Sequence, residues 1–131
     1  MRSDLAEPLS VMSRRMRSRH GPLAHSLEVM LARDERVRAV TAGLLPGVGA
    51  VLLAATTRRM VAVSREGWSI SVFYPQISSV VASGWLGVTA TVTINAAGTV
   101  LAIRAPWHTG REFADAVRIG TPIVSGGLAA L

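Results

Sequence analysis

Two rhythms of apolar and polar residues follow one another along this chain, and the change comes near residue 34. In the first 33 residues, apolar side chains recur every three or four positions, which is the spacing of an amphipathic helix. These apolar positions are Leu5, Leu9, Met12, Met16, Leu23, Leu27, Met30 and Leu31. The pattern predicts a helix over residues 4–19, a stop at Gly21-Pro22 and a second short helix that ends near Arg33.

Beyond residue 35 the chain is built from short runs rich in β-branched residues, separated by turn signals. The runs cover residues 37–45, 50–64, 68–74, 77–83, 88–94 and 99–105. We divide the longest run at residues 56–59, which gives about seven strands. Strands in such close succession are typical of an antiparallel sandwich or small barrel.

The segment that follows these strands predicts a further helix. Thr109 and Glu112 stand in the relation of a capping box, in which the hydroxyl accepts a helix N–H and the carboxylate reaches back. Phe113, Ala116 and Val117 then share one face, and Gly120 is placed to end the helix in the left-handed conformation. We expect this face to close the open end of the strands.

An uncharged stretch of nineteen residues, 39–57, is long enough for a membrane-spanning helix. A proline and two glycines interrupt it, and the still longer uncharged stretch 67–103 has the pattern of strands. We therefore interpret the lack of charge as a property of the whole β region. The chain is divided into a helical segment at 1–33, one domain at 34–119 and a tail at 120–131.

Composition favours a globular protein with one core, because half of the residues are apolar and 17% are charged. The chain has no cysteine, which excludes disulfide scaffolds and thiolate metal sites. Its first twenty residues lack the apolar core of a secretory signal. We expect a cytoplasmic protein.

Basic residues are all arginine and give a net charge of +6, which suits an anionic partner. Arg14, Arg15 and Arg17 lie on the predicted first helix and are candidates for contact with an anionic membrane surface. Arg58 and Arg59, between two predicted strands, are candidate anion contacts as well. A solvated helix face in a basic protein is the other interpretation.

Catalytic chemistry has no recognisable basis in the sequence. His20 and His25 are five residues apart across Gly-Pro, so they lack the spacing of a helical metal pair, and His108 precedes a predicted helix cap. The carboxylates lie beside arginines, and no glycine-rich segment has the residues of a phosphate-binding loop. We expect no catalytic residue, no metal and no cofactor.

Four segments in this order resemble bacterial pleckstrin-homology-like domains over Arg36 to Arg118. They are "LLAATTRRMVAV" with Thr56 and Arg59, "VFYPQISSV" with Tyr74 and Ile77, "GWLGVTATVTI", and "TGREFADAV". The resemblance implies a barrel of about seven antiparallel strands capped by a C-terminal helix, here preceded by a short N-terminal helical segment. It also implies a bacterial protein that self-associates or acts near membranes.

The predicted function is that of a non-enzymatic interaction module, which forms a homo-oligomer or docks a protein partner. Trp85 and Leu86 occupy a glycine-flanked turn, and with Tyr74 and Pro75 they are the candidate contacts. Pro75 either blunts an edge strand or turns a barrel corner. The alternative function is peripheral binding of anionic lipid, whereas few aromatics lie among the arginines to favour nucleic acid.

Overall fold

The computed structural model describes residues 2–10, 14–85 and 87–121, without the side chains of residues 14–21 and 85. Its helices are α1 (Ser3–Ser10), α2 (Arg14–Met30), the short 3₁₀ helix η1 (Tyr74–Gln76) and α3 (Trp107–Gly120). Its strands are β1 (Val37–Leu45), β2 (Gly49–Thr56), β3 (Arg59–Ser64), β4 (Ser69–Phe73), β5 (Ile77–Trp85), β6 (Thr89–Ala96) and β7 (Thr99–Pro106).

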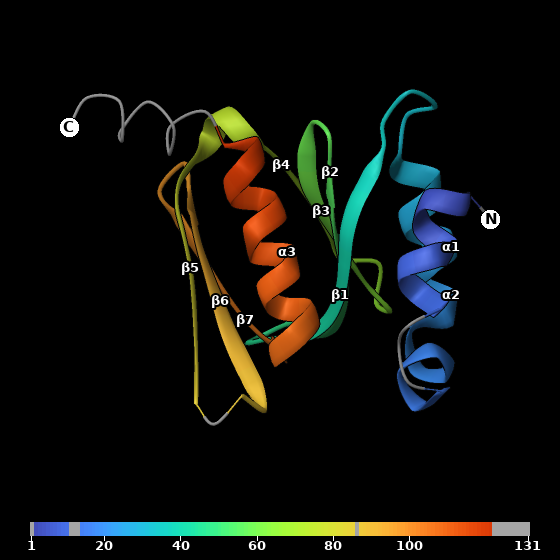
Figure 1. The fold of residues 1–131 in the computed structure, drawn as a ribbon. Coiled ribbons are helices and arrows are strands. Elements are labelled where there is room, and N and C mark those ends of the chain that lie inside the picture. Colours follow the sequence, from blue (N-terminus) through green and yellow to red (C-terminus); the bar gives the residue numbers. More distant parts are fainter. Residues whose placement is uncertain (1, 11–13, 86, 122–131) are drawn as a thin grey trace.

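The seven strands form one antiparallel sheet in the order β4-β3-β2-β1-β7-β6-β5, with α3 lying against it (Figure 1). The predicted number of strands, the final helix and the N-terminal helical segment are thus confirmed. The division of the long run at residues 56–59 is also correct, because β2 ends at Thr56 and β3 begins at Arg59. One feature differs from the prediction, because β4 and β5 end the order and the sheet does not close into a barrel.

The two halves of the sheet meet where β1 crosses β7, and Leu44 of β1 pairs there with Arg104 of β7. Gly43 lies beside this crossing. A Cβ atom at Gly43 would lie 2.6 Å from Cγ2 of Ile103 and 2.9 Å from the carbonyl oxygen of Arg104. The close approach of the two strands therefore requires the absence of a side chain at this position.

The main core lies between the sheet and α3. Phe113, Ala114 and Val117 of α3 are fully buried there, among apolar side chains from both halves of the sheet. Phe113 and Val117 are the residues that the helical spacing predicted. The sheet thus encloses one face of an amphipathic helix, and this burial is the main apolar contribution of the domain.

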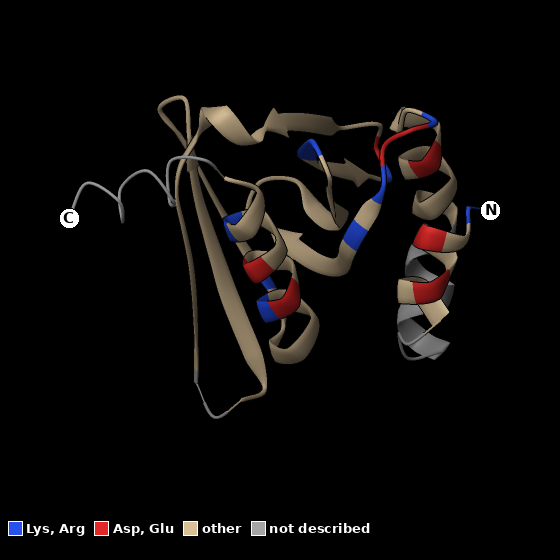
Figure 2. Cartoon of the chain, turned by 45° about the horizontal axis from the view of Figure 1, so that its top comes forward, with Lys and Arg blue, Asp and Glu red and all other residues tan. Residues whose placement is uncertain are grey.

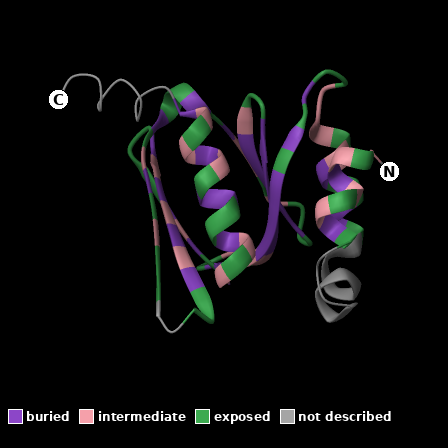
Figure 3. Cartoon of the chain, viewed as in Figure 1, coloured by how far each residue is buried: buried purple, intermediate pink, exposed green. Residues whose placement is uncertain are grey.

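A second core lies on the opposite face of β1, β2 and β3, where α1 and α2 cover the sheet (Figures 1 and 3). Leu5 and Leu9 of α1 and Leu23 and Leu27 of α2 are buried in it. Alternate residues of one strand therefore enter different cores: in β2, Leu53 lies in the main core and its neighbours 52 and 54 in the second.

Burial on both faces explains the uncharged stretch 39–57. It forms β1, a tight turn and β2, whose side chains are buried on either side of the sheet. Among the residues that the structure describes, no helix combines the length and the apolar character needed to cross a bilayer. The interpretation of this stretch as strands is confirmed.

The break between the two N-terminal helices does not lie at Gly21-Pro22, as the sequence predicted. α2 runs from Arg14 to Met30 and continues through both residues. A proline inside a helix removes one backbone hydrogen bond and crowds the preceding turn. Burial of Leu23 and Leu27, which follow Pro22 in the same helix, offsets this cost, because both side chains contribute to the second core.

The beginning of α3 also differs from the prediction. The helix starts at Trp107, two residues before the expected cap, so Thr109 lies inside its first turn. The Thr109 hydroxyl bonds with the hydroxyl of Thr41 at 2.9 Å, and Glu112 pairs with His108 at 3.0 Å. The predicted capping box is therefore wrong, because the residue that precedes the helix is Pro106, which provides no side-chain cap, and Thr109 bonds to Thr41 of β1.

Gly120 does not end α3 in the left-handed conformation. It is the last residue of the helix, and the cap residue Thr121 has a φ of −87°. A Cβ atom at Gly120 would lie 2.4 Å from Cε2 of Tyr74. The glycine is thus required by the contact between α3 and the Tyr74 ring, which a single sequence does not reveal.

The second core yields a prediction for stability. Leu27→Ala should lower the free energy of unfolding by about 2–5 kcal/mol, because removal of most of a fully buried side chain leaves a cavity in its place. The matched control is Val29→Ala in the same helix, where the side chain is 72% exposed and the change should stay within about 0.5 kcal/mol. Urea denaturation measures both, and equal effects would show that α2 does not pack on the sheet.

Candidate functional site

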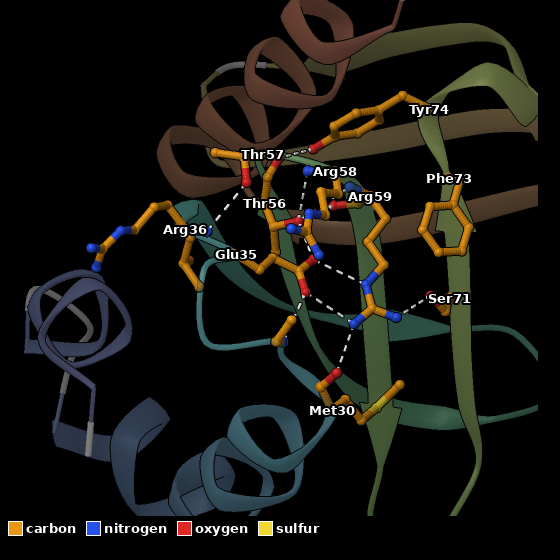
Figure 4. A network of polar contacts seen from close by, with 12 residues as sticks. Met30, Glu35, Arg36, Thr56, Thr57, Arg58, Arg59, Ser71, Phe73 and Tyr74 are labelled. Atoms are coloured by element: carbon orange, nitrogen blue, oxygen red, sulfur yellow. Dashed lines mark hydrogen bonds and ion pairs between the residues drawn. The ribbon is translucent and has the colours of Figure 1, made fainter.

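The turn between β2 and β3 is organised by the hydroxyl of Thr56. Its oxygen accepts the backbone N–H groups of Arg58 and Arg59, both at 3.1 Å. The hydroxyl lies 2.5 Å from Oε2 of Glu35, to which it donates. A single buried threonine therefore fixes the turn and also reaches the loop between α2 and β1 (Figure 4).

Glu35 and Arg59 form an ion pair in the interior. Nε of Arg59 donates to Oε2 of Glu35 and Nη2 donates to Oε1, both at 3.0 Å. The backbone N–H of Ala32 also donates to Oε1, at 3.1 Å. The Glu35 side chain is 1% exposed, so this carboxylate depends on these donors in place of water.

The remaining contacts of Arg59 extend the network to α2 and β4. Nη2 also donates to the carbonyl oxygen of Met30 at 2.6 Å, and Nη1 donates to Oγ of Ser71 at 2.9 Å. The guanidinium lies over the Phe73 ring, 5.6 Å from its centroid (Figure 4). Four of the five guanidinium N–H donors thus serve protein groups, which gives Arg59 a structural role, and its contact with an anion stays a prediction.

The side chain of Arg58, unlike its backbone N–H, takes no part in this network. This side chain is 47% exposed and pairs with Asp34 at the surface. The two adjacent arginines, which sequence reasoning treated as equivalent, therefore have different environments. The signal that distinguishes them is the position of each in the strand register, since Arg59 is the first residue of β3.

The pKa of Glu35 records the strength of this arrangement. Burial by itself would raise the pKa of the carboxyl group. Hydrogen bonds from Arg59, Thr56 and the Ala32 backbone outweigh burial and lower the pKa from 4.5 to about 2. Glu35 therefore remains ionised in the folded protein at any pH well above this value.

Tyr74 and Pro75 join the two edge strands of the sheet through η1. The Tyr74 side chain is buried, and its hydroxyl donates to the carbonyl oxygen of Thr56. Burial raises the pKa of Tyr74 to about 12. Tyr74 thus lacks the exposure expected of a partner contact, whereas Pro75 is exposed and turns the corner between β4 and β5.

The other predicted contacts lie partly outside the described residues. The backbone of α2 includes Arg14, Arg15 and Arg17, but the structure does not describe their side chains. Trp85 ends β5 without a described side chain, and Leu86 falls outside the described residues. The apolar side chains of α1 are buried under the sheet, so they are not presented to a bilayer.

The feature that stands out among the described surfaces is the edge strand β5. It has nine residues, pairs on one side with β6 and ends the sheet order. Neither β5 nor β6 contains a charged residue, and no blue or red interrupts these strands in Figure 2. Natural edge strands are commonly protected by charge, proline, short length or a β-bulge. β5 has none of the first three within its span, and its register shift against β6 lies at its start, between Ile77 and Ser79.

The hairpin between β6 and β7 determines which way each backbone group of β6 points. Ala97 and Gly98 have φ angles of 51° and 83°, as in a two-residue type I′ turn. Ala96 and Thr99 close this turn and pair with one another. The backbone groups of Ala96 therefore face β7, and those of the next residue inward, Asn95, face β5.

Alternation then places the free backbone groups of β5. Asn95 pairs with Ser79, and Val81 and Ser83 follow with the same orientation toward β6. The residues that direct their N–H and C=O groups outward are Val80, Ala82 and Gly84. The hydrogen bond from Nη2 of Arg118 to the Val80 carbonyl oxygen, at 3.3 Å, agrees with this assignment.

The face of β5, β6 and β7 that points away from α3 carries side chains that are uncharged with one exception. These side chains are Ser79, Val81, Ser83, Thr91, Thr93, Asn95, Val100, Ala102 and Arg104. Arg104 is the one charged residue among them, and Val81 and Val100 are 54% and 60% exposed. This face contrasts with that of β1 to β3, which α1 and α2 cover (Figure 3).

Comparisons of the chain with protein-family models, with curated proteins and with solved structures find no match. The resemblance to pleckstrin-homology-like domains therefore stays a prediction. Within residues 2–10, 14–85 and 87–121, no group of three or more histidine or acidic side chains is arranged to hold a metal ion.

The ion pair predicts the pH dependence of stability. The pKa of Glu35 is about 2 in the folded chain and 4.5 as its ordinary value, so its contribution is fully present above pH 4.5 and is lost as the pH falls toward 2. The difference corresponds to roughly 3 kcal/mol. Denaturant titrations of the wild type and of Glu35→Gln between pH 6 and pH 2 should give a steeper decline for the wild type, and parallel curves would contradict the network.

The contrast between neighbouring arginines gives a second prediction for this network. Arg59→Met leaves the Glu35 carboxylate buried without its cation and should lower the free energy of unfolding by about 3–5 kcal/mol. Arg58→Met removes an exposed pair and should cost about 1 kcal/mol or less. Thermal and urea unfolding of the two variants measure the difference, which should vanish if Arg59 is an exposed anion contact.

Proposed function

We propose that this chain is a non-enzymatic, pleckstrin-homology-like interaction module whose partner is a second copy of itself, bound through β5. The observation that carries the proposal is the long edge strand without charge, whose outward N–H and C=O groups match those of an identical strand. The resemblance of the sequence to a self-associating bacterial family supports the same function.

The distribution of charge favours β5 as the contact between identical copies. Each chain carries a net charge of +6, so two copies repel one another wherever their arginines approach. The stretch 67–103 contains no charge and supplies both β5 and β6. Contact along this strip therefore joins two basic molecules with the least electrostatic opposition.

The opposite edge of the sheet is less suited to pairing. β4 has five residues, against nine in β5, and it runs directly into the η1 corner. Short edge strands offer few backbone groups to a partner. Of the two edges, β5 is therefore the one that supplies an extended template.

A two-fold axis at Ala82 gives the pairing with the largest number of outward groups. Ala82 then faces its own equivalent, and Val80 faces Gly84 of the second copy. Each of these pairs exchanges two hydrogen bonds in an antiparallel ladder. The outer-face residues on either side, Val81 and Ser83, face one another across the same axis.

This register gives a direct test. In Val81→Lys/Ser83→Lys, lysines of the two copies lie opposite one another at the axis, and like charges in this position oppose strand pairing. The wild type should behave as a dimer in light scattering after size exclusion, and the variant should behave as a monomer. Circular dichroism should show the same β-rich fold for both, because the two positions point away from the core.

The matched control places the same charges one strand away. Thr93→Lys/Thr91→Lys changes the residues of β6 that pair with Val81 and Ser83, about 5 Å further from the axis in each copy. This control should remain a dimer. A wild type that stays monomeric at high concentration, or equal loss of dimer in both variants, would overturn the proposal.

A further inference from the structure

We propose that Arg118 of α3 guards the β5 edge and sets the affinity with which a second copy pairs there. The inference rests on the proposed function and concerns its regulation. Nη2 of Arg118 donates to the Val80 carbonyl oxygen at 3.3 Å, across 38 residues of sequence. It is a side-chain donor from the final helix that occupies a backbone acceptor of the edge strand.

The Val80 carbonyl is one of the outward groups that pairing requires. In the register centred on Ala82, it accepts the N–H of Gly84 from the second copy. The guanidinium of Arg118 fills the same position in the single chain, so it and the incoming strand compete for one acceptor. Two Val80 carbonyls are affected per dimer, because the two-fold axis repeats the competition.

The position of Arg118 is itself held by α3. Its Nη1 donates to Oδ1 of Asp115 at 2.8 Å, one turn earlier in the helix. The arginine side chain is 39% exposed, so it can move aside into solvent when a strand arrives. The bond to Asp115 therefore holds the Arg118 side chain near the Val80 carbonyl, and its exposure allows it to leave that carbonyl.

The chain offers a second contrast that separates a guard from an ordinary surface charge. Arg111 lies on the same helix, with its guanidinium 5.1 Å from the centroid of the Trp107 ring. It carries the same charge as Arg118, but among the described residues its guanidinium lies over Trp107 and forms no hydrogen bond with β5. Replacing either arginine lowers the net charge equally, so any general reduction of repulsion between copies appears in both variants.

The experiment compares the dimer dissociation constants of the wild type, Arg118→Met and Arg111→Met by sedimentation equilibrium. Methionine keeps an apolar stem but has no donor. Arg118→Met should bind its second copy about five- to thirtyfold more tightly than Arg111→Met does, because two competing hydrogen bonds are absent per dimer. Adding Val81→Lys/Ser83→Lys to Arg118→Met should restore the monomer, since the gain uses the same edge.

The outcomes distinguish the guard from the proposed function. If the wild type dimerises through β5 and Arg118→Met and Arg111→Met have equal affinities, the guard is wrong and the function stands. If Arg118→Met is weaker than Arg111→Met, Arg118 belongs to the interface and the guard is equally wrong. If all three chains are monomers at every concentration, the proposed function itself fails. Faster hydrogen exchange at the Gly84 amide in the monomer than in the dimer would locate the pairing at this strand.

Discussion

The buried ion pair between Glu35 and Arg59 is the interaction on which the arrangement of layers depends. It connects the loop after α2 to the first residue of β3 and, through Ser71, to β4. Most other contacts between the helical layer and the sheet are apolar and have no direction of their own, although the Val37 N–H of β1 also donates to Asp4 of α1 at 2.8 Å. The charged network supplies that direction, because its donors and acceptors meet in one relative placement of helix and strands (Figure 4).

The face of the sheet that points away from α3 differs between its two halves. α1 and α2 cover β1 to β3, whereas the corresponding face of β5 to β7 carries threonine, serine and valine without a covering element among the described residues. A strand that is buried on both faces rarely carries a charged residue. A strand with one exposed face usually alternates apolar residues with polar or charged ones. The lack of charge in residues 39–57 therefore follows from burial, whereas β5 and β6 lack charge although one of their faces is not covered by a described element.

Much of the β region could be predicted from sequence, because turn residues and β-branched runs are local signals. Thr56 ends one strand and Arg59 begins the next, as the sequence pattern indicated. The course of α2 through Pro22 and the close contact of Gly120 with Tyr74 could not be predicted, since each is decided by a distant neighbour. The same holds for Arg59 and Arg58, whose environments differ although their local sequence does not.

The unequal lengths of the two terminal strands limit the size of any assembly. A sheet with two long open sides can add further copies without end, which is how fibres grow. Here β4 has five residues and β5 has nine. In the dimer that we propose, the β5 edges are both covered, and the short β4 edge offers few backbone groups to a third copy. Growth by strand addition would then stop at a closed pair.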